Sequence, residues 1–123
     1  SNAKQLGKLL SDKGLRIVTG DTDTHMILVD VTPFQLTGKI AEEKLAEVGL
    51  IVNRNTIPYD TNPPRVASGI RIGTPAISTR GMNAEAIVII ADCIIGILKG
   101  REESKLIKNK VKELANKFPI DLE

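Results

Sequence analysis

The sequence is poor in aromatic residues and has a single cysteine. It contains no tryptophan, and its aromatic side chains are those of Phe34, Tyr59 and Phe118. Nucleic-acid binding requires a basic face, and usually aromatic rings for single strands, so a formal net charge of only +2 argues against this class. Because Cys93 is the single cysteine, an internal disulfide is excluded. The place of this cysteine in an apolar helical pattern predicts a small buried side chain in a reducing compartment.

Long apolar runs are also absent. The longest, residues 86–91, is too short to span a bilayer, and no signal-peptide pattern opens the chain, so we expect no membrane association and a cytoplasmic location. The 123 residues, 41% of them hydrophobic, suit one domain with one core. Residues 1–3, Ser-Asn-Ala, have the composition of a tag remnant, so we expect one natural domain over residues 4–123.

Apolar residues at helical spacing predict four helices. The first covers residues 3–12 and ends at Gly14, where glycine can take the left-handed conformation of a Schellman stop. The second lies within residues 36–50, with Thr37 as its cap and Gly49 as its stop. Asn83 can cap a third helix, which Gly100 breaks. Residues 102–118 form a fourth, whose lysine-rich face is expected to be solvated.

Short strands are predicted between these helices. Residues 15–20 form one, and residues 25–31, nearly all apolar, form a second that is central in its sheet. Residues 51–65 begin as a brief strand, but Pro58, Pro63 and Pro64 then require a long exposed loop of the kind that is functional or disordered. Residues 68–73, Ser-Gly-Ile-Arg-Ile-Gly, alternate as a further strand.

The succession of these elements predicts the fold class. Helix, strand, strand, helix, strand, strand, helix, helix favours an α+β two-layer sandwich: a small, mostly antiparallel sheet with helices on one face. Residues 25–31 have too few polar positions to stand against water, so we expect something else to cover the other face.

Arg71 is the strongest single signal of a binding site. Ile70 and Ile72 flank it, so its side chain points to the opposite face of the strand from both. A guanidinium matches a carboxylate or phosphate with two parallel hydrogen bonds, which lysine cannot imitate, and Gly69 and Gly73 allow close approach. The pattern equally allows an arginine at a sheet edge that is paired with a surface carboxylate.

Other polar groups give weaker signals. Thr74 and Pro75 predict a structural corner before the third helix. His25 lies near Asp21 and Asp23, but this spacing closes no metal site, so we interpret it as a structural histidine and expect no metal. The Asn53-Arg54-Asn55 triplet could aim amide groups at a ligand or simply form a turn.

The sequence contains no recognisable set of catalytic groups. No Ser-His-Asp order, Cys-His pairing or phosphate-binding glycine loop is present, and no lysine lies in an apolar context that would lower its pKa. From the residues alone, the chain is interpreted as the ligand-contacting half of a site whose reactive groups are elsewhere.

Three stretches carry a family resemblance: residues 19–31, residues 36–60 and residues 68–81. They contain the motifs T-D-x-H, V-N-x-N-x-I-P and S-G-I-R-x-G-T-P-A-x-x-x-R-G. In this order and spacing the motifs resemble the carboxy-terminal part of serine hydroxymethyltransferases, enzymes of the aminotransferase-like pyridoxal phosphate fold that interconvert serine and glycine with tetrahydrofolate. The resemblance extends from the first helix to about Gly100 and implies the small domain of that fold.

The resemblance also implies roles for single residues. Arg71 matches the arginine that binds the α-carboxylate of serine or glycine, and Asn55 matches an asparagine that hydrogen-bonds the folate pterin. Where relatives commonly have Ser-Pro-Phe near the folate, this chain has Pro63, Pro64 and Arg65, whose arginine could meet the anionic glutamyl tail. The supporting positions are Gly69, Gly73, Thr74, Pro75 and His25.

The catalytic half of such an enzyme is expected upstream of Lys4. The family's Schiff-base lysine and cofactor phosphate cradle belong to the larger domain, so this chain alone is expected neither to hold pyridoxal phosphate nor to catalyse. The parent enzyme would be a dimer or tetramer. The alternative is a stand-alone regulatory α+β module that binds small carboxylates and self-associates through its exposed sheet.

Overall fold

A computed structural model of the chain describes residues 2–19, 26–73, 84–100 and 104–117. The elements in chain order are α1 (Asn2–Asp12), β1 (Arg16–Thr19), β2 (Met26–Asp30), the 3-10 helix η1 (Thr32–Phe34), α2 (Gly38–Glu47), β3 (Asn53–Asn55), β4 (Gly69–Gly73), α4 (Ala84–Lys99) and α5 (Ser104–Lys117). This order confirms the predicted succession of helices and strands. The short helix η1 was not predicted. Pro33 lies in its first turn, where the fixed φ of proline suits a helix start.

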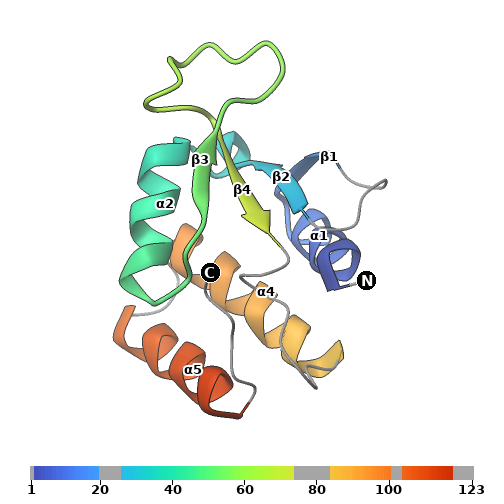
Figure 1. The fold of residues 1–123 in the computed structure, drawn as a ribbon, viewed down its shortest axis with the longest axis vertical. Helices are drawn as coiled ribbons and strands as arrows, with labels where there is room; N and C mark the ends of the chain where they lie inside the picture. Colours follow the sequence, from blue (N-terminus) through green and yellow to red (C-terminus); the bar gives the residue numbers. More distant parts are fainter. Residues whose placement is uncertain (1, 20–25, 74–83, 101–103, 118–123) are drawn as a thin grey trace.

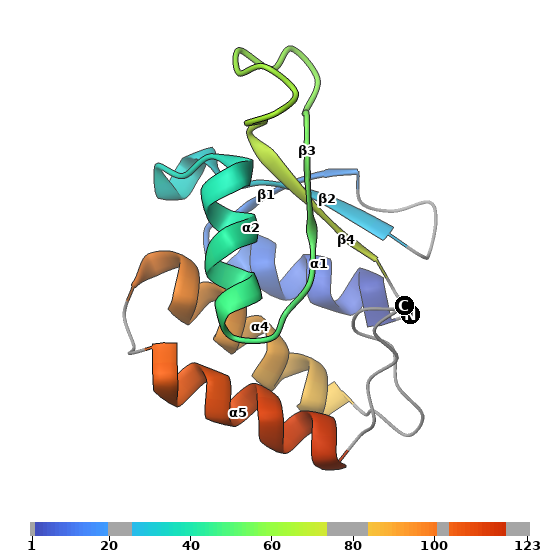
Figure 2. The same cartoon turned by 60° about the vertical axis from the view of Figure 1, so that its left-hand side comes forward.

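The strands form one antiparallel sheet in the order β1-β2-β4-β3 (Figure 1). Strand β2 is interior, as its apolar sequence predicts, and β4 is interior between β2 and β3. Helices α1 and α2 contact the strands, α4 packs against α1 and α2, and α5 packs against α4 (Figure 2). The domain is therefore an α+β sandwich with its helices on one face of the sheet, as predicted.

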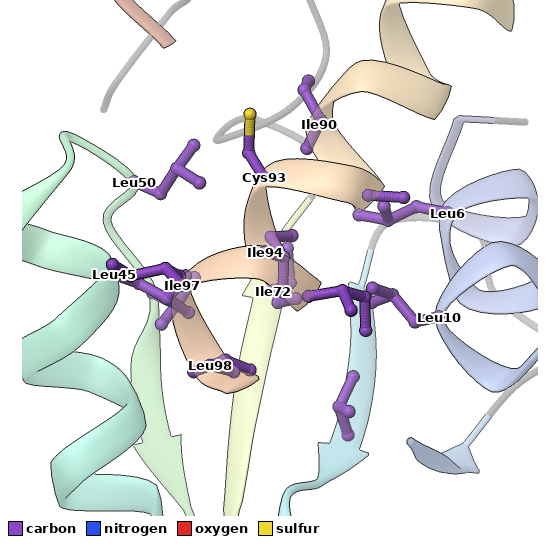
Figure 3. Close-up of a cluster of buried hydrophobic side chains, with 14 of the residues drawn as sticks. Leu6, Leu10, Leu45, Leu50, Ile72, Ile90, Cys93, Ile94, Ile97 and Leu98 are labelled. Carbon is purple, nitrogen blue, oxygen red and sulfur yellow. The ribbon is translucent and has the colours of Figure 1, made fainter. Parts of the chain in front are cut away.

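The core is built around α4. Most residues of this helix are buried, and its exposed residues, Glu85, Val88, Asp92 and Lys99, lie along one side. Figure 3 shows Leu6 and Leu10 of α1 on one side of α4 and Leu45 of α2 on the other. Cys93 is 2% exposed, which confirms that it is a buried side chain. On α5, Ile107, Val111 and Leu114 are buried. The described lysines of α5 are exposed, as predicted.

The predicted helix ends are confirmed by their hydrogen bonds. Gly14 has φ 109°, and the amide of Leu15 donates to the carbonyl of Leu10 at 3.1 Å, the pattern of a Schellman stop. Gly49 has φ 90° and ends α2 in the same way. The Thr37 hydroxyl accepts a hydrogen bond from the amide of Ile40 at 3.2 Å, so Thr37 caps α2.

Asp30 joins the first two strands to the turn that follows them. Its Oδ2 accepts from Arg16 Nε at 2.9 Å and lies 2.8 Å from a terminal nitrogen of the same guanidinium. Its Oδ1 accepts from the amide and the hydroxyl of Thr32 at 2.9 and 2.7 Å. Burial alone would raise the pKa of Asp30, but these hydrogen bonds outweigh it and hold the pKa below its ordinary value of 3.8.

Gly38, the first residue of α2, lies against the backbone of β4. A Cβ at this position would collide with the carbonyl oxygen of Gly69 and come within 3.2 Å of that of Val66. The amides of Gly38 and Lys39 donate to the carbonyls of Ala67 and Val66 at 3.0 and 2.9 Å. The start of α2 therefore docks directly onto the segment that leads into β4.

We predict that Gly38→Ala destabilises the domain. The added methyl group must push α2 away from β4, which should lower the free energy of unfolding by about 1–3 kcal/mol, as overpacking does. Urea unfolding measures this change. Gly7→Ala in α1 is the matched control, because its Cβ would be 3.7 Å from Ile27, an ordinary contact, and alanine is the better helix former. Equal stability of Gly38→Ala and the wild type would contradict the close approach.

We also predict an acid-dependent contribution from Asp30. Because its folded-state pKa is lowered, the carboxylate stabilises the fold fully above the ordinary value of 3.8, and this contribution is lost as the pH falls through the lower folded-state pKa. The difference in unfolding free energy between the wild type and Asp30→Asn should be constant from about pH 5 to 7 and shrink below about pH 4. A difference that grows on acidification would contradict this assignment.

Candidate functional site

The candidate site lies on the face of the sheet that points away from the helices. On β4, Ile70 and Ile72 are 0% and 1% exposed on the helix side, while Arg71 is exposed on the other. This confirms the predicted alternation. In the register of the sheet Arg71 lies directly opposite Leu28 of β2 and Asn53 of β3, so the three side chains share the open face.

Leu28 is half-buried and Arg71 and Asn53 are exposed, so the open face is more polar than the sequence of β2 alone suggested. Within the described ranges, none of the helices covers it (Figures 1 and 2).

Arg71 has no carboxylate partner in the part of the chain that the structure describes. Lys13, Arg16 and Arg54 form ion pairs there, and Arg71 is in none of these. Asp30, a carboxylate of the neighbouring strand, already binds Arg16 and Thr32. The surface ion pair that the pattern allowed is therefore not formed among these residues, and the guanidinium of Arg71 is open to a ligand.

Asn55 occupies the next position along the same face. It pairs with Gly69 in the register of β3 and β4, and Gly69 pairs on its other side with Asp30. The side chain of Asn55 is half-buried, and its amide nitrogen donates to the carbonyl of Thr56 at 2.9 Å. This hydrogen bond fixes the amide group at the end of an edge strand. The amide lies beside Leu28, Arg71 and Asn53, the cross-strand set that is called the Arg71 row below.

Gly69 allows the loop base to fold over the sheet. A Cβ there would lie 2.8 Å from the side chain of Ile57 and 2.9 Å from the carbonyl of Val29. Gly69 therefore permits a close approach by the protein's own loop, and its support of a ligand site stays a prediction. Gly73 ends β4 opposite Met26.

Residues 56–68 form a loop that projects beyond the ends of β3 and β4, away from α5 (Figures 1 and 2). Pro63, Pro64 and Arg65 are exposed on it, as a ligand-contacting loop requires. Two of its non-glycine residues, Tyr59 and Ala67, have φ values of 58° and 60°. Such left-handed backbone costs about 1 kcal/mol or more per residue and persists only where surrounding contacts hold it.

Asp60 supplies many of these contacts. Its Oδ2 accepts from the amides of Ile57 and Ser68 at 3.1 and 2.9 Å. Its Oδ1 accepts from the amide of Asn62 at 2.8 Å and from the hydroxyl of Ser68 at 2.6 Å. The Asn62 side chain donates to the same hydroxyl at 2.9 Å. One carboxylate thus joins both ends of the loop, so the predicted long loop is a hydrogen-bonded unit.

The pKa of Asp60 is also below its ordinary value of 3.8. Burial acts to raise it, and the hydrogen bonds from Ser68, Asn62 and Ile57 outweigh burial. The Asp60 carboxylate is therefore fully ionised near neutral pH. This carboxylate, together with the hydrogen bonds that it accepts, is called the clamp below. Its role was not predicted from sequence, although an aspartate whose carboxylate accepts the amide two residues later is a recognised turn signal.

Arg54 ties the same loop to α2. Its Nε donates to Glu42 Oε1 at 2.9 Å, and its amide donates to Glu42 Oε2 at 3.0 Å. Its terminal nitrogen donates to the carbonyl of Arg65. The backbone beneath the Arg65 side chain is thereby fixed, and the middle residue of the Asn53-Arg54-Asn55 triplet has a structural role.

Several predicted residues lie outside the described residues: His25 with Asp21 and Asp23, Thr74, Pro75, Asn83 and Phe118. Across the described ranges, no group of three His, Cys, Asp or Glu side chains could hold a metal ion. None of the helices described is long and apolar enough to cross a membrane.

The sequence of this chain is similar to those of known proteins. A family model for serine hydroxymethyltransferase matches residues 1–94. A serine hydroxymethyltransferase from Coprothermobacter proteolyticus is 51% identical over 120 residues, which cover 96% of this chain and 29% of that relative. The chain therefore spans less than a third of the length of the relative that it matches. With a family match over most of its residues, the chain belongs to the serine hydroxymethyltransferase family.

Proposed function

We propose that the chain is the C-terminal small domain of a serine hydroxymethyltransferase and supplies the amino-acid carboxylate site of the intact enzyme. That enzyme would interconvert serine and glycine with tetrahydrofolate as the one-carbon carrier. The observation that carries the proposal is the exposed Arg71 on the open face of the sheet, with no carboxylate partner among the described residues. The family match supports the reaction class.

In this proposal Arg71 binds the α-carboxylate of serine or glycine. The planar guanidinium donates two parallel hydrogen bonds to the two carboxylate oxygens, which fixes the orientation of the amino acid as well as its position. Orientation of the bond to be broken is a large catalytic contribution. Because β4 is paired on both sides, its backbone can hold Arg71 rigidly for this purpose.

The folate contacts are proposed for the adjoining end of the sheet. Asn55 would hydrogen-bond the pterin, and Pro63, Pro64 and Arg65 would lie along the rest of the folate. Support comes from their location: Asn55 is next to the Arg71 row, and the three loop residues are exposed on a segment that Asp60 and Arg54 hold in place. The Arg65 guanidinium would meet the glutamyl carboxylates.

Pyridoxal phosphate is proposed as the cofactor of the intact enzyme, but the described residues do not fit it. A Schiff-base lysine must be shielded from water, whereas none of the lysines whose side chains the structure describes is buried. The lysine and the phosphate cradle would belong to the large domain, and the parent enzyme would assemble as a cytoplasmic dimer or tetramer.

We predict that Arg71→Lys in the full-length protein strongly impairs the use of serine. Lysine keeps the charge but loses the two-bond fork. The loss of one hydrogen bond to a charged group costs about 1.5–3 kcal/mol, so kcat/KM for serine should fall about 10- to 100-fold. Steady-state kinetics measure this effect. Arg16→Lys is the matched control, since Arg16 lies on β1 and pairs with Asp30, and it should leave kcat/KM unchanged. Near-normal kinetics of Arg71→Lys would remove Arg71 from this role.

A second prediction concerns the chain by itself. Added pyridoxal phosphate should give no visible absorbance of lysine-bound cofactor, and calorimetry should detect little serine binding, because one carboxylate contact cannot offset the entropy lost on association. A micromolar serine Kd without the cofactor band would instead favour the stand-alone carboxylate-binding module. Serine cleavage above background would show that the catalytic groups lie within this chain.

A further inference from the structure

The two strands that carry the candidate site are held in different ways. Strand β4 has β2 on one side and β3 on the other, and its pairing with β2 runs through the register from Gly69 to Gly73. Strand β3 is a three-residue edge strand whose only strand neighbour in the described sheet is β4. Arg71 therefore keeps a paired backbone if β3 loosens, but Asn55, at the end of β3, does not.

Asp60 lies at the point where this edge strand needs support. It binds the amide of Ile57, two residues after β3 ends, and the amide and hydroxyl of Ser68, the residue before β4 begins. The last pair of β3 and β4 is that of Asn55 and Gly69. The hydrogen bonds of Asp60 thus connect the two chain segments just beyond this pair. Ile57, held in this way, packs over Gly69.

The clamp also sets the path of the exposed loop segment. Pro63 accepts from the amides of Val66 and Ala67 at 2.9 and 2.8 Å, and Asn62, which binds Asp60, precedes it directly. Because Ala67 has a left-handed backbone, this turn requires support from its surroundings. Support comes from Asp60 on one side and from the amide of Gly38 on the other.

We propose that Asp60 is a positioning residue for the folate half of the site alone: it holds Asn55 and residues 63–65 in place, while Arg71 is held independently by β2. This inference rests on the proposed function for the identity of the two ligands. It adds that the amino-acid and folate subsites are mechanically separate, and that a single carboxylate which touches neither ligand controls one of them.

The test compares two substitutions in the full-length protein. Asp60→Asn replaces one acceptor oxygen with an amide group that faces hydrogen-bond donors, so the clamp opens with almost no change in size. Asp30→Asn is the matched control. Asp30 also accepts hydrogen bonds from a backbone amide and a hydroxyl, both of Thr32, and from the guanidinium of Arg16. It differs from Asp60 in that it holds β1 and η1 instead of the loop. Ser68→Ala, which removes one donor to Asp60, is a milder second variant if Asp60→Asn does not fold.

Calorimetry with serine and with tetrahydrofolate gives the first readout. Asp60→Asn should raise the Kd of tetrahydrofolate by roughly tenfold or more and change that of serine by less than about twofold, while Asp30→Asn leaves the ratio of the two unchanged. Ser68→Ala should show the same asymmetry with a smaller effect. Equal weakening of both ligands, or no change in either, would overturn the proposal.

Amide hydrogen exchange gives a readout that needs no ligand. Asp60→Asn should speed exchange at Asn55 and across residues 56–68 and leave Arg71 and Ile72 protected. Uniform acceleration across the sheet, or none in the loop, would overturn the separation of the two halves. If the wild type binds neither serine nor tetrahydrofolate, the proposed function fails, and the exchange pattern alone then decides whether Asp60 holds Asn55.

Discussion

The pairing of β4 on both of its edges is the constraint on which the rest of the structure depends. Ile70 and Ile72 must enter the core, and the two-residue period of a strand then leaves Arg71 no choice but the open face. A slip of one residue would bury the guanidinium among the helices, at a cost of several kcal/mol for an unpaired charge. The register that keeps Ile70 and Ile72 in the core is thus the same register that exposes the guanidinium of Arg71.

Around β4, glycine residues allow backbone segments to contact one another directly, where larger side chains would keep them apart. The absence of a side chain at Gly38 and Gly69 lets α2, β4 and the base of the loop approach one another. The polar groups brought into that crowded region are satisfied by neighbouring carbonyls and by two carboxylates, Asp60 and Glu42. A loop rich in proline and carrying left-handed residues is consequently well determined in shape, although its outer surface faces solvent.

The sequence allowed accurate prediction where the cause of a structure is local. Thr37, Gly14 and Gly49 act within one helical turn, and the alternation around Arg71 acts within one strand, so their roles could be inferred from neighbours in the chain. Asp60 and Gly38 could not be assigned in this way. Their partners, Ser68 and the carbonyl of Gly69, are brought to them by tertiary contacts that no local pattern specifies. The covering that the apolar sequence of β2 predicts over the open sheet face stays a prediction.

The non-sequential strand order has a consequence for how the domain assembles. Asp30 pairs with Gly69, so the central ladder closes a segment of about 40 residues that contains α2 and β3, and such non-local closure is slow relative to helix formation. During synthesis β4 emerges after both β2 and β3, so the sheet cannot be completed before residues 69–73 are made. Because Arg71 lies on β4, the open face of the sheet takes its final form only when β4 has paired with β2, and the rate of this non-local pairing limits how fast that face appears.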